Sequence, residues 1–571
     1  MEIGLAGYRW KVISEQNKAP SYVLKKYGKV LGQLIYNRRE IFSDDLDEEI
    51  IYPKFTKLLE PSLFTDLAKV SYELADVIKK GKKIVVYGDY DADGITSTSL
   101  LINFLRDIKV NVRYYIPSRF NEGYGLNKKA IKKIAEIADV LIVVDSGTNA
   151  FEELMYAQKL GLKVFIFDHH EPKNPNWNAD KIYILNPKLY GDIDESFKHL
   201  ASVGIVFYIL IMLRKLLNLD IQLRQYLDIV SIGTVADVVP LSLINRILVK
   251  KGIEELNKKQ RIGIKSLLDN LDIKEASTFD LSFIIAPRLN AAGRLDDAKK
   301  AVKLLITRSK KVGDTISKEL ELLNKKRQKL TELIYKEAQL QISKNISDTK
   351  SIVVSNSNWH PGIVGIVAGR LAQKYKVPSV VLSVHNGKAI GSARSSGNIN
   401  IYKFIEENSE LFEKYGGHAL AAGFTIPVKN IPKFTKRLEN YIRNLSEEDK
   451  ITYINIDMEV PLSYWTEKAI EELKILEPFG EGNPYPIFIA RDLRIDDFIT
   501  VGHENQHLKF WFKDERGDVY PALWWGAVNY FKYLSVGMKV DIVYIPKVSS
   551  WRGRRSIEFI LEDIKIRRKN G

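Results

Sequence analysis

The sequence predicts a multidomain α/β protein that ends in a β-rich domain. Two stretches, which begin near residues 82 and 349, alternate short β-branched runs with helical segments. A third stretch, after the charged residues 446–450, has many aromatic residues and strand-like pieces but few helical ones. The chain of 571 residues is long enough for several domains of roughly 100–200 residues each. Its apolar share of 45% is ample for packed cores.

The first α/β stretch carries strand-like runs separated by helical segments of 10–13 residues. The runs cover residues 83–88, 112–117, 139–145 and 163–168, and the helical segments cover 95–107, 127–138 and 151–160. This alternation predicts right-handed βαβ units and a mostly parallel sheet. Residues 201–345, which follow, are predicted to be mainly helical.

The second α/β stretch and the tail complete the predicted architecture. Strands are expected at 351–355 and 379–384, with a helix at 365–374 between them. In the tail, strand-like pieces that fit a small five-stranded barrel cover residues 453–460, 486–489, 507–512, 519–525 and 540–546. We therefore expect five parts: a helical lead-in at 1–80, a first α/β domain at 81–245, a helical connector at 246–348, a second α/β domain at 349–446 and a β-barrel domain at 447–571.

Charge and cysteine content exclude several classes of protein. Lys and Arg outnumber Asp and Glu by 86 to 71, and this net charge of +15 favours a polyanionic partner. Residues 299–345 hold 13 basic and 5 acidic residues, which predict either a solvated helix face or a surface for nucleic acid. The absence of Cys excludes disulfides, thiolate metal sites and a thiol nucleophile. The sequence shows no membrane span and no export signal, so we expect a cytoplasmic protein.

Acidic residues and histidines stand at the ends of three predicted strands. They are Asp89, Asp91 and Asp93 after the first strand, Asp145 at the end of the third, and Asp168, His169 and His170 at the end of the fourth. Ligands of parallel sheets gather at the carboxyl ends of the strands, so we expect these side chains to share one crevice. Clustered carboxylates repel one another and need cations. Mixed carboxylate and imidazole ligands suit Mn²⁺, with Mg²⁺ less favoured.

Each of these features has a structural alternative when it is taken alone. An Asp after a strand commonly caps the next helix, and a His pair is often part of a surface loop. All three clusters on neighbouring strand ends favour a metal site instead. Two ions about 3.5–4 Å apart would serve phosphoryl hydrolysis, with Asp145, alone on its strand, as the bridging ligand. The motifs of P-loop NTPases, serine hydrolases and zincins are missing.

Several motifs between residues 83 and 425 stand in the order of a known family. They read GDYDADG (88–94), VDSG (144–147), DHHEP (168–172), ASVGIVFY (201–208) and GTVADVVPL (233–241), followed by APRLNAAGRLDDA (286–298). These motifs resemble the DHH phosphoesterase superfamily and, within it, the RecJ family. Its partner domain, DHHA1, is similar to the stretches WHPGIVGIVAGRL (359–371), GSARSS (391–396) and GGHALAAGF (416–424). The β-rich tail corresponds in position to the OB-fold domain of that family.

The resemblance implies a ligand set for two ions of Mn²⁺ or Mg²⁺. That set is Asp89, Asp91, Asp93, Asp145, His169 and Asp237, with His170 near the scissile phosphate. Many relatives have a His four residues before the position of Asp91, where this sequence has Tyr87. Asp89 is expected to compensate, because the RecJ branch has an Asp there.

Further residues are expected to hold substrate phosphates. An Arg fork suits bidentate phosphate contacts, and the GSARS segment offers Ser392 and Arg394. The resemblance implies that Arg119, Ser392 and Arg394 hold a terminal phosphate, which would explain dependence on a strand end. Arg294 and His418 are further candidates. Taken alone, each of these is equally a solvated Arg or a turn residue.

The resemblance implies an exonuclease that degrades single-stranded DNA in the 5′→3′ direction to mononucleotides, in DNA repair and recombination. We expect a monomer, and a single-strand-binding protein is a candidate partner. In the tail, stacking on bases or core packing is expected for Trp511, Trp524, Trp525 and Trp551, and phosphate contacts for Arg552, Arg554 and Arg555.

Other functions of the same fold stay open at this point. One is a small-substrate DHH phosphoesterase that cleaves nano-RNA, cyclic dinucleotides or bisphosphorylated nucleosides. Another is a family II-type pyrophosphatase. The basic connector and the third domain weigh against both, because a small substrate needs neither. The last is a non-catalytic DHH scaffold at the replication fork, which the intact set of acids disfavours.

Overall fold

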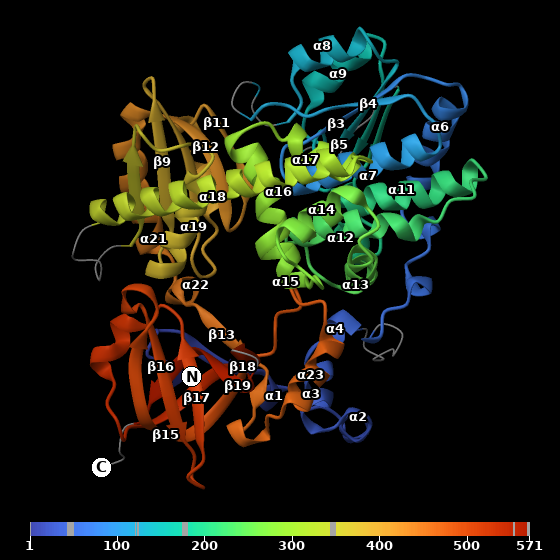
Figure 1. Cartoon of the computed structure of the whole chain (residues 1–571). Coiled ribbons are helices and arrows are strands. Elements are labelled where there is room, and N and C mark those ends of the chain that lie inside the picture. Colours follow the sequence, from blue (N-terminus) through green and yellow to red (C-terminus); the bar gives the residue numbers. More distant parts are fainter. Residues whose placement is uncertain are drawn as a thin grey trace. The chain divides into compact units, whose positions relative to one another are not determined.

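Figure 1 shows the computed structural model of the chain, which describes residues 2–42, 51–119, 122, 125–173, 181–342, 350–551 and 554–567. The chain divides into two compact units, and each is described here by itself. The first unit comprises Met1–Asn37, Arg327–Lys474 and Tyr485–Gly571, and the second comprises Arg38–Lys326 and Ile475–Pro484. Each unit therefore combines segments that lie far apart in the sequence.

The second unit is built on a parallel sheet, as the alternating pattern predicts. Its strands lie in the order β4-β3-β5-β6-β7, and every neighbouring pair is parallel. The strands are β3 (Ile84–Gly88), β4 (Val112–Tyr115), β5 (Val140–Val144), β6 (Lys163–Phe167) and β7 (Ile182–Leu185). β3 and β5 are buried along their whole length, which explains their continuously apolar sequences. The edge strand β7 was not predicted from the sequence.

Helices cover both faces of this sheet. On one face, Val86 of β3 packs in a core with α6 (Leu67–Lys79), α7 (Ala92–Asp107) and α11 (Ser202–Leu216). On the other face, Val85 packs with α8 (Lys128–Ala135) and α9 (Phe151–Lys159), because successive side chains of a strand point to opposite faces. The remaining helices of this unit are α4 (Arg39–Phe42), α10 (Glu195–Lys198), α12 (Leu227–Ala236), α13 (Leu243–Asn257), α14 (Ile262–Asn270), α15 (Thr278–Asp280), α16 (Ala286–Leu295) and α17 (Lys299–Ile306).

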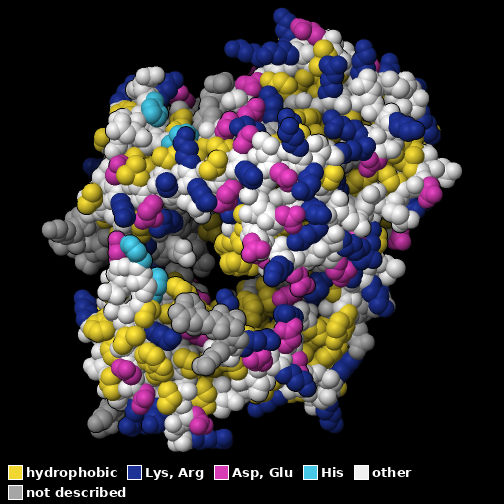
Figure 2. Space-filling model, in the orientation of Figure 1, with side chains coloured by type: hydrophobic (Ala, Val, Ile, Leu, Met, Phe, Trp, Pro, Cys, Tyr) yellow, Lys and Arg dark blue, Asp and Glu magenta, His cyan; other side chains and the backbone are white. Residues whose placement is uncertain are grey.

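The long helix α18 (Lys310–Gln341) carries much of the basic charge of the connector and extends from the second unit into the first. Several Lys side chains on α18 and on the preceding helix α17 form ion pairs with acidic residues. Lys300 lies 2.9 Å from Asp296 and 3.2 Å from Glu319, and Lys325 lies 3.3 Å from Glu321. Figure 2 shows Lys and Arg interspersed with Asp and Glu over the visible face. For these residues the solvated helix face is therefore the better interpretation.

The first unit contains a mixed sheet in the order β11-β12-β10-β9-β8. β8 (Ile352–Asn356) and β9 (Ser379–His385) are parallel and are connected by α19 (Val364–Tyr375), as predicted. The antiparallel strands β10 (Lys388–Arg394), β11 (Lys414–His418) and β12 (Ala421–Pro427) were not predicted, because their Gly- and Ala-rich sequences lack the usual strand composition. The helices here are α20 (Ile401–Glu407), α21 (Ile431–Asn444) and α22 (Glu447–Lys450).

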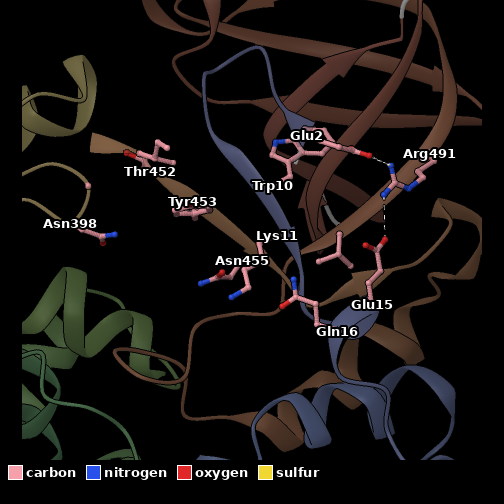
Figure 3. A pocket seen from close by; sticks show the side chains of 13 residues that line it. Glu2, Trp10, Lys11, Glu15, Gln16, Asn398, Thr452, Tyr453, Asn455 and Arg491 are labelled. Atoms are coloured by element: carbon pink, nitrogen blue, oxygen red, sulfur yellow. Dashed lines mark hydrogen bonds and ion pairs between the residues drawn. The ribbon is translucent and has the colours of Figure 1, made fainter. Parts of the chain in front are cut away.

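The N-terminal segment of the first unit is not helical throughout. β1 (Glu2–Ile3) and β2 (Arg9–Val12) form a sheet with β13 (Tyr453–Ile456), and β2 runs parallel to β13. The helices α1 (Ile13–Gln16), α2 (Ser21–Tyr27) and α3 (Lys29–Asn37) follow. A pairing partner more than 400 residues away leaves no local signal in the sequence. A groove of about 680 Å³ lies over this sheet. Figure 3 shows the side chains that line it, among them Arg491, whose Nη1 lies 3.0 Å from Glu2 Oε1.

The tail forms a closed β-barrel, as predicted. The strand expected at 453–460 is not one of its five closing strands, because Tyr453–Ile456 pair with β2 instead, and the closing strand β19 was not predicted. Its strands lie in the order β14-β15-β16-β17-β19-β18, and pairing of β15 with β18 closes the barrel. They are β14 (Met458–Glu459), β15 (Phe488–Val501), β16 (His507–Lys513), β17 (Val519–Trp524), β18 (Lys539–Trp551) and β19 (Arg554–Ile566), with α23 (Glu467–Glu472) before β15. Among the described residues of the whole chain, no helix is long and apolar enough to cross a membrane.

Candidate metal centre

The predicted acids lie together at the carboxyl end of the parallel sheet. Asp89 follows β3, Asp145 follows β5 and Asp168 follows β6, and these strands are neighbours. Asp89, Asp93 and Asp145 are at most 2% exposed. Asp145 has a left-handed backbone conformation, with φ of 59°. Such strain in a residue other than Gly is typical of functional positions.

Side chains at this edge form three overlapping groups of the kind that holds a metal ion. In each group, one ligand atom from every residue lies within 4.8 Å of the others. The groups are Asp145 with His169 and His170, Asp93 with His169 and Asp237, and Asp89 with Asp91 and Asp145. His169 Nε2 lies 3.5 Å from Asp145 Oδ1 and 3.4 Å from Asp237 Oδ2. Because Asp145 and His169 each belong to two groups, these groups merge into one site.

Helix N-termini hold two of the carboxylates in place. Asp91 is the N-cap of α7 and accepts two backbone N–H bonds from its first turn, each 3.1 Å long. Asp93 accepts hydrogen bonds from the backbone N–H groups of Ser202 and Val203, at 2.7 and 3.0 Å, where α11 begins. The Ser202 hydroxyl donates to Asp145 at 3.1 Å. Asp91 therefore has both of the roles considered above: it caps α7, and it belongs to the group with Asp89 and Asp145.

The crowding of carboxylates makes their charged forms unfavourable. Burial, and next the charge of Asp91, raise the pKa of Asp89 and Asp145 well above the ordinary value and that of Asp93 to about 6. Burial and the charge of Asp93 likewise raise the pKa of Asp237. Within the described residues, Asp89 Oδ1 and Asp237 Oδ2 are buried and accept no hydrogen bond. Divalent cations would supply the missing charge and the missing partners, so this donor set fits metal ions.

Asp168, one of the acids expected at the strand ends, has a role that the sequence did not indicate. Its carboxylate accepts a hydrogen bond from His170 Nδ1 at 2.7 Å and from the backbone N–H groups of His169 at 2.8 Å and Thr148 at 3.0 Å. Burial, the largest single effect, raises the pKa of Asp168, but the hydrogen bonds of His170 and Thr148 and the charges of His170 and His169 together outweigh it and hold that pKa well below its usual value. For His170 the directions are reversed: burial lowers the pKa of its imidazole, but the hydrogen bond and charge of Asp168 outweigh burial and raise that pKa to about 9. The signal that could have revealed this role is the position of Asp168 directly before the two histidines.

Three family models match successive parts of the chain. The DHH family N-terminal domain matches residues 83–234, the DHHA1 domain 348–444 and the RecJ OB domain 456–563. Over 567 residues the chain is 32% identical to the single-stranded-DNA-specific exonuclease RecJ of Bacillus subtilis. The aligned region covers 98% of this chain and 71% of that protein. The chain belongs to the RecJ family.

Other members of the RecJ family support the same assignment. The exonuclease RecJ of Escherichia coli is 31% identical over 527 residues, which cover 86% of this chain and 89% of that protein. The crystal structure of RecJ from Thermus thermophilus in complex with Mn²⁺ matches with a TM-score of 0.83 and 27% identity, over 98% of this chain and 79% of that one. Its complex with Mg²⁺ has a TM-score of 0.77. The predicted family and the α/β fold with a terminal barrel are thereby confirmed.

Two of the predicted phosphate-binding residues lie beside the loop that carries the acids of this RecJ-family site. The guanidinium carbon of Arg119 lies 5.2 Å from the centre of the Tyr90 ring. Burial raises the pKa of Tyr90, and the positive charges of Arg119 and Arg294 both act against that rise. The α16 helix, which carries Arg294, also holds the loop, because Asn290 Oδ1 accepts a hydrogen bond from the N–H of Ala92 at 2.9 Å.

The other predicted phosphate-binding residues belong to the first unit. Ser392 and Arg394 lie on β10, and Arg394 Nη1 donates to the Ser392 hydroxyl at 2.9 Å. The start of α19 passes close to both: a Cβ on Gly365 would lie 3.0 Å from Ser392 Oγ and 3.3 Å from Arg394 Nη2. A larger residue at position 365 would therefore crowd both side chains. His418, at the end of β11, is exposed.

The aromatic residues of the RecJ OB domain differ in exposure. Trp524 is only 4% exposed and stacks on Tyr530, so it belongs to the core. Trp511 is half-buried beneath Lys509, whereas Trp525 is 58% exposed. Arg555 lies 3.3 Å from Glu467. Arg552 and the side chains of Trp551 and Arg554 lie outside the described residues.

A cavity of about 540 Å³ opens beside the metal centre. Its lining includes His169, Lys188, Tyr190, Lys198 and His199. The charge of Lys188 also lowers the pKa of Asp237, although burial, the largest effect, and the charge of Asp93 raise it. The metal centre is thus open to solvent on the His169 side.

Proposed function

We propose that this member of the RecJ family is an exonuclease that degrades single-stranded DNA from its 5′ end to mononucleotides by metal-dependent hydrolysis. The observation that carries the proposal is the buried set of Asp and His side chains in three overlapping groups at the sheet edge. The relatives from Bacillus subtilis and Escherichia coli are named single-stranded-DNA-specific exonucleases, which supports the same substrate here.

The donor set supports two divalent ions, Mn²⁺ or Mg²⁺. The proposed ligands are Asp89, Asp91, Asp93, Asp145, His169 and Asp237. Asp145 is the proposed shared ligand, because it belongs to two of the three groups and, unlike the imidazole of His169, has two oxygens that can bind two ions. When bound, such ions lower the pKa of a water molecule and neutralise charge on the scissile phosphate. The imidazole of His169 favours Mn²⁺ over Mg²⁺.

His170 is proposed to stabilise the negative charge that develops on the phosphate during hydrolysis. The hydrogen bond from Nδ1 to Asp168 fixes the orientation of the ring, and the Asp168 carboxylate raises the pKa of His170 against the effect of burial, which favours the protonated ring. A cation that is already oriented in a buried site pays little reorganisation energy when that charge forms. Asp168 thus acts as a positioning residue rather than as a metal ligand.

A binding site for the terminal phosphate would explain why the enzyme starts at a strand end. We assign this binding site to Arg119, Ser392 and Arg394, with Arg294 and His418 as further phosphate contacts. The hydrogen bond between Arg394 and Ser392 fixes the guanidinium, which favours bidentate binding of a phosphate. Action as a monomer in the cytoplasm, beside a single-strand-binding protein, stays a prediction.

End-labelled substrates test the proposed function. Purified protein with Mn²⁺ is incubated with single strands labelled at either end, with a duplex and with a dinucleotide. We expect immediate release of labelled mononucleotide from the 5′-labelled single strand alone. Preferred cleavage of the dinucleotide would instead favour a small-substrate phosphoesterase. Absence of cleavage in every sample would favour the non-catalytic scaffold.

Arg394→Ala is expected to remove most of the preference for a 5′-phosphorylated strand over a 5′-hydroxyl strand. A hydrogen bond to a charged group contributes about 1.5–3 kcal/mol, so the kcat/KM ratio of the two substrates should fall about 10- to 100-fold. The dependence on Mn²⁺ concentration should not change. Arg437→Ala, on α21 of the same unit, is the matched control. A retained phosphate preference with weaker Mn²⁺ dependence would reassign Arg394.

A further inference from the structure

Two phenylalanines are exposed on the helical segment that supports the acidic loop. Phe279 and Phe283 are 63% and 67% exposed. Their ring centres lie 4.9 Å apart, with an angle of 34° between the planes. Figure 2 shows hydrophobic side chains at the surface near α15. Single exposed apolar side chains are common, but two large exposed rings in contact form an aromatic patch that a ligand can cover.

The two rings belong to a stripe that leads to the metal centre. α15, a π-helical turn at Leu281–Ile285 and α16 follow one another without a break. Among the exposed or half-buried side chains of this segment, five recur every three or four residues and so share one face. They are Phe279, Phe283, Pro287, Asn290 and Arg294.

The far end of the stripe lies at the acidic loop. Asn290 accepts the hydrogen bond from Ala92, and a Cβ on Gly293 would lie 2.3 Å from the carbonyl oxygen of Tyr90. At a rise of 1.5 Å per residue, Phe283 lies about 16 Å from Arg294 along the helix. A stacked strand advances about 3.4 Å per nucleotide, so about five nucleotides span that length and a trinucleotide does not. π-helical turns are rare and concentrate at functional sites, and this one contains Phe283 and follows the short helix that carries Phe279.

We propose that Phe279 and Phe283 form a stacking platform for bases of single-stranded DNA that have not yet reached the metal centre. The proposal rests on the exonuclease function proposed above. An exonuclease has to accept every base in turn, and an aromatic face suits this task because every base has a π face. The rings hold the strand without reading its sequence, while Arg294 faces the phosphates at the other end of the stripe.

Paired variants and substrates of different length test the platform. In Phe279→Ala/Phe283→Ala, kcat/KM for strands of about 20 nucleotides should fall roughly 10- to 100-fold, as expected for the loss of base stacking. A trinucleotide, too short to reach the rings, should be cleaved as fast as by the wild type. Phe279→Leu/Phe283→Leu should lose as much as the Ala pair, and Phe279→Trp/Phe283→Trp should retain activity. Tyr72→Ala, which removes another ring that is 66% exposed in the same unit, should change nothing.

Abasic substrates separate stacking from other effects of the rings. With the wild type, kcat/KM for a long strand that lacks the bases a few positions from its 5′ end should fall by the same factor as the double Ala substitution causes on an intact strand. With the double Ala variant, removal of these bases should lower kcat/KM no further. The platform is overturned if that variant cleaves long strands normally, or if it cleaves the trinucleotide and the long strand equally poorly. A wild-type protein that cleaves no single strand would overturn the proposed function itself.

Discussion

Asp145→Asn is expected to lower kcat at least about 1,000-fold, since the shared ligand of a two-ion site stabilises several kcal/mol of charge in the transition state. The side chain belongs to two of the three ligand groups and is 1% exposed. An amide of the same shape keeps an oxygen toward the Ser202 hydroxyl but cannot carry the charge that holds two cations. The measurements are single-turnover cleavage of a labelled strand and Mn²⁺ binding by calorimetry.

A control for Asp145→Asn lies at the opposite end of the same strand. Asp139 directly precedes β5, is exposed and accepts the backbone N–H of Lys83 at 2.9 Å. Asp139→Asn should therefore leave kcat and Mn²⁺ binding unchanged. Normal Mn²⁺-dependent turnover by the Asp145→Asn protein would contradict the two-ion assignment, provided that its thermal unfolding matches that of the wild type.

The parallel sheet could be predicted because its signal is local. β3, β5 and β6 are short apolar runs, and each has its acid or histidine directly at its end. The strands β10 and β12 were missed because antiparallel pairing stabilises them although their sequences are rich in Gly and Ala. The pairing of β2 with β13 could not be predicted either, since it joins segments more than 400 residues apart that share no local pattern.

The positions of the acids were predictable, but their supports were not. The sequence indicates that Asp89, Asp145 and His169 gather at one edge, because parallel strands end together. It does not indicate that the start of α11 donates two hydrogen bonds to Asp93, or that Asn290 holds the acidic loop from a helix almost 200 residues later. Such contacts depend on how helices pack over the sheet, which no short motif encodes. Asp237 was predicted to be a metal ligand only through the family resemblance. In the structure its Oδ2 lies 3.4 Å from His169 Nε2.

Asp168→Asn should lower kcat and raise the Mn²⁺ concentration for half-maximal activity, each by about 10- to 100-fold, as is usual for residues that orient metal ligands. The carboxylate accepts backbone N–H groups that position both histidines and holds the His170 ring through Nδ1. In Asp168→Asn, the side-chain NH₂ group replaces one of the two oxygens that accept hydrogen bonds from the protein, so at least one of these bonds is lost. The substitution also removes the negative charge that raises the pKa of His170. The loss should therefore appear both in the chemical step and in metal affinity, whereas a purely structural role would lower the melting temperature alone.

Glu171→Gln is the matched control for Asp168→Asn, since it removes a carboxylate three residues away whose side chain is 67% exposed. Its ion pair with Lys188, at 2.9 Å, is a surface pair and should contribute little. Kinetics at saturating Mn²⁺ separate the two effects of Asp168: the metal-affinity loss is titrated away, and the remaining loss of kcat reports the orientation and charge of His170. If saturating Mn²⁺ restores kcat completely, His170 has no part in charge stabilisation and Asp168 acts on the metal site through His169 alone.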